Sequence, residues 1–462
     1  MIDVLIRGAG LAANLLARQL RLELPELEVV LVDPLVPRPR PLGEATVEVA
    51  GAYLSRLGLG EMLAETQLPK SSIRLFFDGP DHNSPLSHMS EVGPVRAGHH
   101  PSWLLDRRTL DAALLKDNRR LGVRVLPQDA PARWVVDATG AGPSHRPLGT
   151  SRQAVWARFE GVENIDSAER PFPSGQSAVH FAYRGRWIWH LRLPGGLTSI
   201  GVVGDVPRLS ADAWLPWLRR HRALEQLLPH ARAVDFGCQR VQPSFSEPLL
   251  EQDRARTGGA ALRPDPLYSP GLDLIAWQNE GIVEVLRRQA AGQHTREFIQ
   301  LYAGFVRLRA EVTAAIADTQ YGGLGSYDLV RLRHHFDRMN NLNVLSLFLG
   351  RAHLDEDFLR HELGRRRVVL GSLHVLGRVF DDLAAHLEQT GEYHRHNVGF
   401  RDGPDDLSFQ RGLADRSPSE VADLQGRLMS QTLGLARRWR LGRFDGPPAE
   451  GWMPTLWEAA QG

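Results

Sequence analysis

The stretch VLIRGAGLAA at residues 4–13, together with VVLVD at residues 29–33, predicts how this 462-residue chain begins to fold. The short apolar runs at 4–6 and 29–32 are typical of buried strands, and the segment 14–24 between them has a helical pattern that ends before Pro25. The spacing from Gly8 to Asp33 suits a nucleotide-binding β-α-β unit. We therefore expect an α/β fold that opens with a Rossmann-like domain.

Each position of the glycine-rich turn has a physical role in such a unit. Gly8 permits the tight turn out of the strand, Gly10 lets the backbone approach a pyrophosphate, and Ala13 lets helix and strand pack closely. The free N–H groups and partial positive charge at the helix start favour a diphosphate. Asp33, at the end of the second strand, is placed to accept hydrogen bonds from an adenosine ribose. This motif alone does not distinguish NAD from FAD.

Composition excludes several classes of protein. Hydrophobic residues make up 42% and charged residues 24%, and the net charge of +1 provides no field that would attract nucleic acid or a membrane. The single cysteine, Cys238, rules out an internal disulfide and a soft-ligand zinc site, and the histidine pairs lack helical metal-ligand spacing. No apolar stretch reaches about 18 residues, and residues 1–10 resemble a buried strand more than a signal peptide. We predict a cytoplasmic protein with no metal, nucleic-acid or membrane partner.

The rest of the chain divides by its hydrophobic pattern. Helices are predicted near 47–57 and 110–121, and strands near 73–77 and 134–136. Apolar alternation between residues 153 and 204 indicates antiparallel sheet. Beyond about residue 296 the apolar positions recur every three or four residues, so we expect that region to be helical.

Further motifs follow the glycine-rich turn in a fixed order. They are GEATV at 43–47, the pair Asp106-Arg107 before a helix, VDATG at 136–140, and DPLYSPG at 265–271, which leads into a helix near Asp273. In order and spacing these segments resemble the flavoprotein monooxygenase family, and more narrowly its halogenase-like branch.

The resemblance implies FAD as the cofactor. In that family the G-E-x-T segment adjoins FAD, and the D-P-L-x-S-x-G turn lays a helix N-terminus against the isoalloxazine ring, where its positive end stabilises reduced, anionic flavin. Beyond the residues of the first turn and Asp33, the cofactor contacts implied are Gly43, Glu44, Arg107, Asp137, Gly140, Asp265, Pro266, Ser269 and Gly271.

The resemblance also implies a domain plan, that of a flavoprotein monooxygenase of the glutathione-reductase type. We expect a discontinuous FAD-binding domain at 1–150 and 250–296. A β-sheet substrate domain is expected at 151–249 together with 60–100, and a helical C-terminal region at 297–462. The boundary near residue 296 is the best supported, because the hydrophobic pattern changes there.

Two segments resemble the halogenases more narrowly. LPKSSIR at 68–74 resembles the segment with their active-site lysine, which captures hypohalous acid or holds it by hydrogen bonding, and this makes Lys70 the candidate catalytic residue. GRWIW at 185–189 resembles their W-x-W signature. From the residues alone, Lys70 could equally be a solvated side chain, and Trp187 and Trp189 could be packing residues.

Four departures from the halogenase pattern weaken that assignment more than the flavoprotein assignment. The W-x-W signature runs on to Leu193 without its usual Ile-Pro ending, and Tyr268 stands where tryptophan halogenases carry a glutamate. The G-D-A segment that holds the flavin ribityl chain lacks its acid at Gly259. The chain between residues 124 and 135 is also too short for the usual β-meander.

The reaction class follows from the resemblance. Reduced FAD and O2 would form a flavin C4a-hydroperoxide, with electrons from NAD(P)H directly or through a partner flavin reductase. Because Tyr268 replaces the glutamate and the Ile-Pro ending is lost, we expect hydroxylation of an electron-rich aromatic substrate. Candidate substrates are an indole and a tryptophan side chain of a partner peptide, as in tryptophylquinone maturation. Tyr268, Trp187 and Trp189 are the substrate-pocket candidates. The alternatives are a halogenase that uses Lys70 as the hypohalous acid relay and a non-catalytic FAD-binding partner protein.

Overall fold

The computed structural model describes residues 1–33, 41–93, 101–140, 145–165, 177–402 and 417–448. A parallel sheet forms at the N-terminus, as the β-α-β signal predicted, with strand order β17-β8-β1-β2-β7. Its strands are β1 (Ile2–Arg7), β2 (Val29–Val32), β7 (Arg124–Leu126), β8 (Ala132–Asp137) and β17 (Arg254–Arg256). The helices around it are α1 (Leu11–Glu23), α2 (Glu48–Arg56), α3 (Gly60–Thr66), α4 (Arg107–Arg120) and α7 (Gly271–Ala290).

A second, larger sheet has the order β14-β10-β13-β12-β11-β4-β5-β19, with β15 also paired to β10. Its strands are β4 (Ser72–Phe77), β5 (Ser90–Val92), β10 (Arg152–Glu160), β11 (Ser177–Tyr183), β12 (Arg186–Arg192), β13 (Thr198–Gly204), β14 (Arg232–Ala233), β15 (Gly237–Val241) and β19 (Arg401–Asp402). Helices α5 (Ala211–Leu218) and α6 (Arg222–Leu227) cover one face. Short strands connect the parts: β3 (Leu68–Pro69), β6 (Trp103–Leu104), β9 (Arg146–Pro147), β16 (Ser244–Phe245) and β18 (Leu262–Arg263).

The large sheet corrects the expectation of antiparallel pairing throughout. Strand β4 pairs with β11 in parallel, and β19 pairs with β5 in parallel. Both pairings join segments far apart in sequence, so no local turn fixes their direction and alternation in one strand cannot reveal it. Strand β19 also lies in the region predicted to be helical, so the C-terminal part of the chain contributes an edge strand. The domain boundaries themselves stay predictions.

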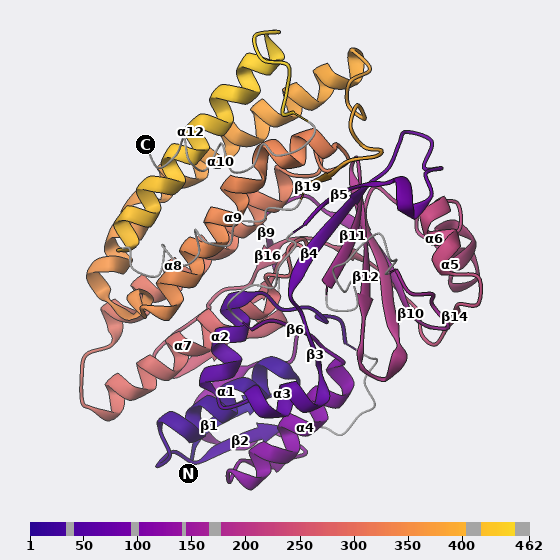
Figure 1. The fold of residues 1–462 in the computed structure, drawn as a ribbon. Coiled ribbons are helices and arrows are strands. Elements are labelled where there is room, and N and C mark those ends of the chain that lie inside the picture. The colour runs from indigo at the N-terminus through magenta and orange to yellow at the C-terminus, as the bar shows by residue number, and fades with distance from the viewer. Residues whose placement is uncertain (34–40, 94–100, 141–144, 166–176, 403–416, 449–462) are drawn as a thin grey trace.

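Four long helices make up most of the described C-terminal region: α8 (Arg296–Asp318), α9 (Tyr327–Leu349), α10 (Glu356–Gln389) and α12 (Pro418–Arg440). They form the layer drawn in orange and yellow in Figure 1, with α10 packed against α8 and α12, and α12 against α9. Alternation along β4 explains how this layer meets the sheet, because Leu75 and Phe77 pack towards α9 while Phe76 packs on the opposite face. None of the described helices is long and apolar enough to cross a membrane.

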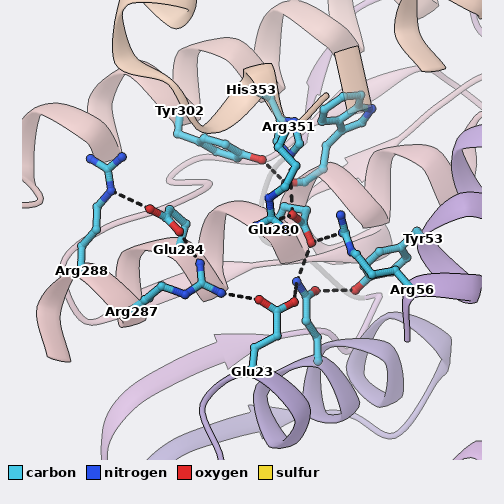
Figure 2. A network of polar contacts seen from close by, with 12 residues as sticks. Glu23, Tyr53, Arg56, Glu280, Glu284, Arg287, Arg288, Tyr302, Arg351 and His353 are labelled. Atoms are coloured by element: carbon cyan, nitrogen blue, oxygen red, sulfur yellow. Dashed lines mark hydrogen bonds and ion pairs between the residues drawn. The ribbon is translucent and has the colours of Figure 1, made fainter. Parts of the chain in front are cut away.

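A buried polar network holds α7 against the first and last parts of the chain (Figure 2). Glu280 of α7 is paired with Arg56 of α2, and it accepts a hydrogen bond from Gln19 of α1. His353, between α9 and α10, lies 3.6 Å from the same carboxylate. Burial alone would raise the pKa of Glu280, but His353 and Arg56 lower it. This carboxylate therefore stays charged and fixes α7 relative to α1 and α2.

Candidate active site

The first candidate feature is an open space at the carboxyl edge of the parallel sheet. Gly8 has φ +109°, and a Cβ there would lie 2.8 Å from the carbonyl oxygen of Ala138, so only glycine lets β1 and β8 end this close together. Gly10 is the N-cap of α1 and provides no side-chain cap, and a Cβ on it would meet nothing within 4 Å. Ala13 is fully buried against the sheet. The helix N–H groups therefore point into space that suits a diphosphate.

The segment after β17 completes this edge. Helix α7 positions it, because Gln278 accepts a hydrogen bond from the Gly258 N–H and Asn279 accepts one from the Thr257 hydroxyl. A Cβ on Gly259 would lie 3.4 Å from Gly140 Cα, which is an ordinary van der Waals contact. The structure therefore has room for the aspartate of the G-D-A segment at this position, although the chain carries glycine there. The surroundings thus fit an FAD diphosphate, with one polar contact to the ribityl chain fewer than the family pattern has.

Other predicted cofactor residues have structural partners. Asp137 accepts hydrogen bonds from the Thr139 N–H (3.0 Å) and hydroxyl (2.7 Å), which shapes the turn that ends at Gly140. Arg107 donates to the Leu42 carbonyl at 2.7 Å and so holds the strand-like segment beside Gly43. Asp33 follows β2 at the same sheet edge. The assignment of these residues to the cofactor stays a prediction.

Glu44, another predicted cofactor residue, is engaged in a buried ion pair. It is 4% exposed, and Arg158 of β10 donates to its carboxylate at 2.6 Å. Burial raises the pKa of Glu44, while the Arg158 charge opposes that shift. In this chain Glu44 therefore fastens the G-E-x-T segment to the large sheet, a role that the sequence did not reveal because Arg158 is more than a hundred positions away.

The turn at 265–271 is strained where it meets α7. Tyr268 has φ +64° and Ser269 has φ +56°, and consecutive left-handed residues other than glycine are costly. The fully buried Asp265 holds the turn by accepting from the Leu267 N–H (2.9 Å) and from Tyr321 (3.1 Å). After Pro266 and Pro270 the helix begins at Gly271, where a Cβ would meet nothing within 4 Å. The N-terminus of α7 thus faces open space, and its placement against the flavin ring stays a prediction.

Beside this turn is a cavity of about 210 Å³. Its wall comes from the segment leading into β4, the turn itself, the first turns of α7, and the C-terminal helices α8 and α9. Lys70 and Tyr268, predicted from separate motifs, line this one cavity. The C-terminal helices, to which the sequence assigned no role, therefore close the candidate substrate pocket.

Lys70 is buried, and its ammonium donates a hydrogen bond to the Thr46 carbonyl. Burial lowers its pKa. His180 of β11 is also buried; desolvation and the charge of Lys70 lower the pKa of His180 to about 3, so the imidazole stays neutral. The sequence did contain a further signal for Lys70. The chain has 55 lysine and arginine residues, and only two of them, Lys70 and Lys116, are lysines. A lysine at a buried position is therefore unusual in a chain that otherwise uses arginine.

The tryptophans of the W-x-W segment lie outside this cavity wall. Their rings pack in the core between the large sheet and α9. Trp187 donates to the Tyr321 hydroxyl at 3.2 Å, and that hydroxyl in turn binds Asp265, while Trp189 donates to Ser199 at 3.0 Å. Trp187 thus supports the strained turn from behind, which accords with the packing alternative for these residues.

Asp273 was named in the sequence only as the start of a helix, and its carboxyl was not predicted to belong to the site. It lies in the first turn of α7, lines the cavity, and accepts a hydrogen bond from the Ala50 N–H at 2.9 Å. Burial raises the pKa of Asp273 to about 8, and the nearby Glu48 adds to the rise. The carboxyl is therefore mostly protonated at neutral pH and can pass a proton within the cavity.

Replacing Asp273 with asparagine should stabilise the protein at high pH. Since the folded pKa is far above the ordinary value of 3.8, ionisation of Asp273 costs stability progressively as the pH rises from about 4 towards 8. Asparagine keeps a neutral acceptor for Ala50. We expect thermal unfolding at pH 9 to show a gain that exceeds the gain at pH 4 by ~1 kcal/mol or more, since one pKa unit corresponds to that order. The control is Asp357→Asn, because Asp357 also lies in a first helical turn but is 94% exposed. A gain equal at both pH values would contradict the shift.

No cluster of three or more histidine, cysteine, aspartate or glutamate side chains suited to a metal ion occurs within the described ranges. The pair His99-His100 lies outside those ranges.

Flavin-dependent halogenases are among the proteins that this chain resembles. No protein-family model matches the chain. A flavin-dependent halogenase, chlA of Dictyostelium discoideum, is 22% identical over an alignment of 441 residues that covers 78% of this chain and 72% of the halogenase.

Among solved structures, halogenase PltM has a TM-score of 0.64 at 17% identity and covers 96% of this chain and 99% of its own. The flavin-dependent brominase Bmp2 has a TM-score of 0.55 at 19% identity and covers 69% of this chain and 87% of its own. The α/β fold with a helical C-terminal region is therefore shared with these halogenases, which confirms the predicted fold class and the predicted resemblance.

Proposed function

We propose that this chain, an FAD-dependent oxidoreductase of the halogenase-like branch of the flavin monooxygenases, transfers a halogen to an electron-rich aromatic substrate. The observation that carries the proposal is the buried Lys70, which lines the same cavity as the turn at 265–271. The relatives support halogenation over the hydroxylation expected from Tyr268, since chlA, PltM and Bmp2 bear the names of halogenating enzymes. PltM has also been crystallised with FAD and phloroglucinol, an electron-rich aromatic ring.

The residues that would hold FAD are those of the open sheet edge. The α1 N-terminus beyond Gly10 would bind the diphosphate, and the α7 N-terminus at Gly271 would face the flavin ring. When bound and reduced, by NAD(P)H or by a partner flavin reductase, FAD would supply two electrons that reduce O2 to the peroxide level, and oxygen at that level is the oxidant that converts a halide ion into hypohalous acid.

Lys70 would act on the hypohalous acid. Its ammonium donates a hydrogen bond to the oxygen of the acid, which draws electrons from the halogen and makes it more electrophilic. The aromatic carbon then forms a bond to the halogen while the halogen–oxygen bond breaks. The oxygen leaves as water after it takes up a proton, and the ring loses its own proton. The walls from α8 and α9 exclude bulk water, so the acid meets the substrate before it escapes.

Product analysis tests this function. Protein loaded with FAD is supplied with a flavin reductase, NADH, O2 and bromide, together with phloroglucinol, phenol or indole, and products are identified by mass spectrometry. We expect a product with the bromine isotope pattern. A product that gains one oxygen, whether or not bromide is present, would instead establish the second candidate, aromatic hydroxylation, which Tyr268 in the place of the glutamate favours. Peroxide as the sole product from every ring would leave only an FAD-binding role.

A further inference from the structure

The cavity that holds Lys70 also contains a cation without a counter-ion. Arg309 of α8 lines the cavity, and its guanidinium makes no hydrogen bond or ion pair with any residue that the structure describes. Burial lowers its pKa, and the charges of Glu362 and Asp273 oppose that shift without a direct contact. Burying an unpaired guanidinium costs desolvation free energy, so its presence at this position calls for a functional explanation.

The acidic groups of the same cavity do not supply the missing charge. Asp337 is paired with Arg333 at 3.2 Å. The negative charge of Glu48 acts on Lys70 and Arg338, where it opposes the lowering of the pKa by burial. Asp273 is mostly neutral at pH 7 because burial raises its pKa to about 8. The charge of Arg309 therefore stays unmatched among the acidic groups that line the cavity.

The wall around Arg309 changes from charged to apolar along one helix face. Thr313, Ile316 and Ala317 follow Arg309 at four-, seven- and eight-residue spacing, so all four side chains line the cavity in a row. A ligand lying along α8 would place an acidic group at Arg309 and an apolar part against Ile316 and Ala317. A planar guanidinium matches a carboxylate with paired hydrogen bonds.

We propose that Arg309 binds the carboxylate of the substrate, and that the substrate is a compact aromatic acid whose ring lies against Ile316 and Ala317, within the cavity lined by Lys70 and Tyr268. This inference rests on the proposed function, because it concerns the same cavity. The anion at Arg309 could also come from a second source, the halide ion, and the experiment separates the two.

Binding of matched probes tests the assignment without turnover. Isothermal titration calorimetry on FAD-loaded protein compares anthranilate with aniline, and indole-3-carboxylate with indole. We expect the wild type to bind each acid at least about tenfold more tightly than its neutral counterpart, since a hydrogen bond to a charged group is worth that order of affinity. Arg309→Gln should remove this preference and leave neutral probes unchanged, and Arg309→Lys should keep part of it.

Arg307→Gln is the matched control, because Arg307 lies on the same helix but is 40% exposed and is paired with Glu311. It should leave the acid preference intact. The assignment is overturned if neither acid binds, if the wild type does not prefer the acids, or if Arg309→Gln weakens both members of each pair equally. A rise in the KM for bromide in Arg309→Gln with an unchanged acid preference would identify a halide site instead. Acid-selective binding without any brominated product would refute the halogenation proposal and leave this assignment standing.

Discussion

Replacing Lys70 with methionine should abolish halogen transfer while O2 consumption continues. Methionine has a similar length and no charge, and burial already disfavours the ammonium, so the variant should fold. Without the donated hydrogen bond, hypohalous acid loses its electrophilic activation beside the substrate. Loss of one such group costs on the order of 100-fold or more in rate, and we expect brominated product to fall by at least that factor. Product mass spectra and an oxygen electrode measure the two quantities on one sample.

The control for Lys70 is the other lysine of the chain. Lys116 is exposed on α4, so Lys116→Met should leave both rates unchanged. If Lys70→Met halogenates at the wild-type rate, Lys70 is a packing residue and the proposed relay is wrong. If O2 consumption falls equally with halogenation, the lysine acts before the halide is oxidised, and its role must be reassigned.

Replacing Gly10 with aspartate should eliminate FAD binding without unfolding the protein. The φ of −81° at Gly10 suits any residue, a Cβ there meets nothing within 4 Å, and aspartate is a favourable N-cap for α1. The carboxylate would however occupy the space assigned to the diphosphate. Like charges a few ångströms apart near a protein surface repel by several kcal/mol, so we expect FAD affinity to fall by about 100-fold or more. Flavin fluorescence titration measures the affinity and thermal unfolding checks the fold.

Gly60→Asp serves as the control for Gly10. Gly60 also lies at a helix start, with nothing within 4 Å of a Cβ, but its helix, α3, is not the one assigned to the diphosphate. It should bind FAD as the wild type does. An unchanged FAD affinity in Gly10→Asp would mean that the diphosphate does not lie at α1.

The local spacing of residues in the sequence was enough to predict much of the fold of this protein. The unit from Gly8 to Asp33 needs only short-range information, since a strand, a tight turn and a helix follow from neighbouring residues. The turn at 265–271 is encoded only partly in the same way. Prolines flank it, but the left-handed conformations of Tyr268 and Ser269 depend on Asp265, which the distant Tyr321 holds by a hydrogen bond. Through their resemblance to the halogenase-like branch, these segments predicted the fold before any long-range contact was known.

Only the tertiary structure decided which reactive and charged side chains line the same cavity. Lys70 and Tyr268 come from separate motifs, and Asp273 and Arg309 from no motif at all, yet all four line one cavity. The pKa of Asp273 and the unpaired charge of Arg309 depend on burial among segments distant in sequence, which no local pattern encodes. The same holds for Glu44, whose charge is met by Arg158 across the fold. The sequence therefore determined the elements, whereas burial and long-range pairing decided the charge and shape of the site.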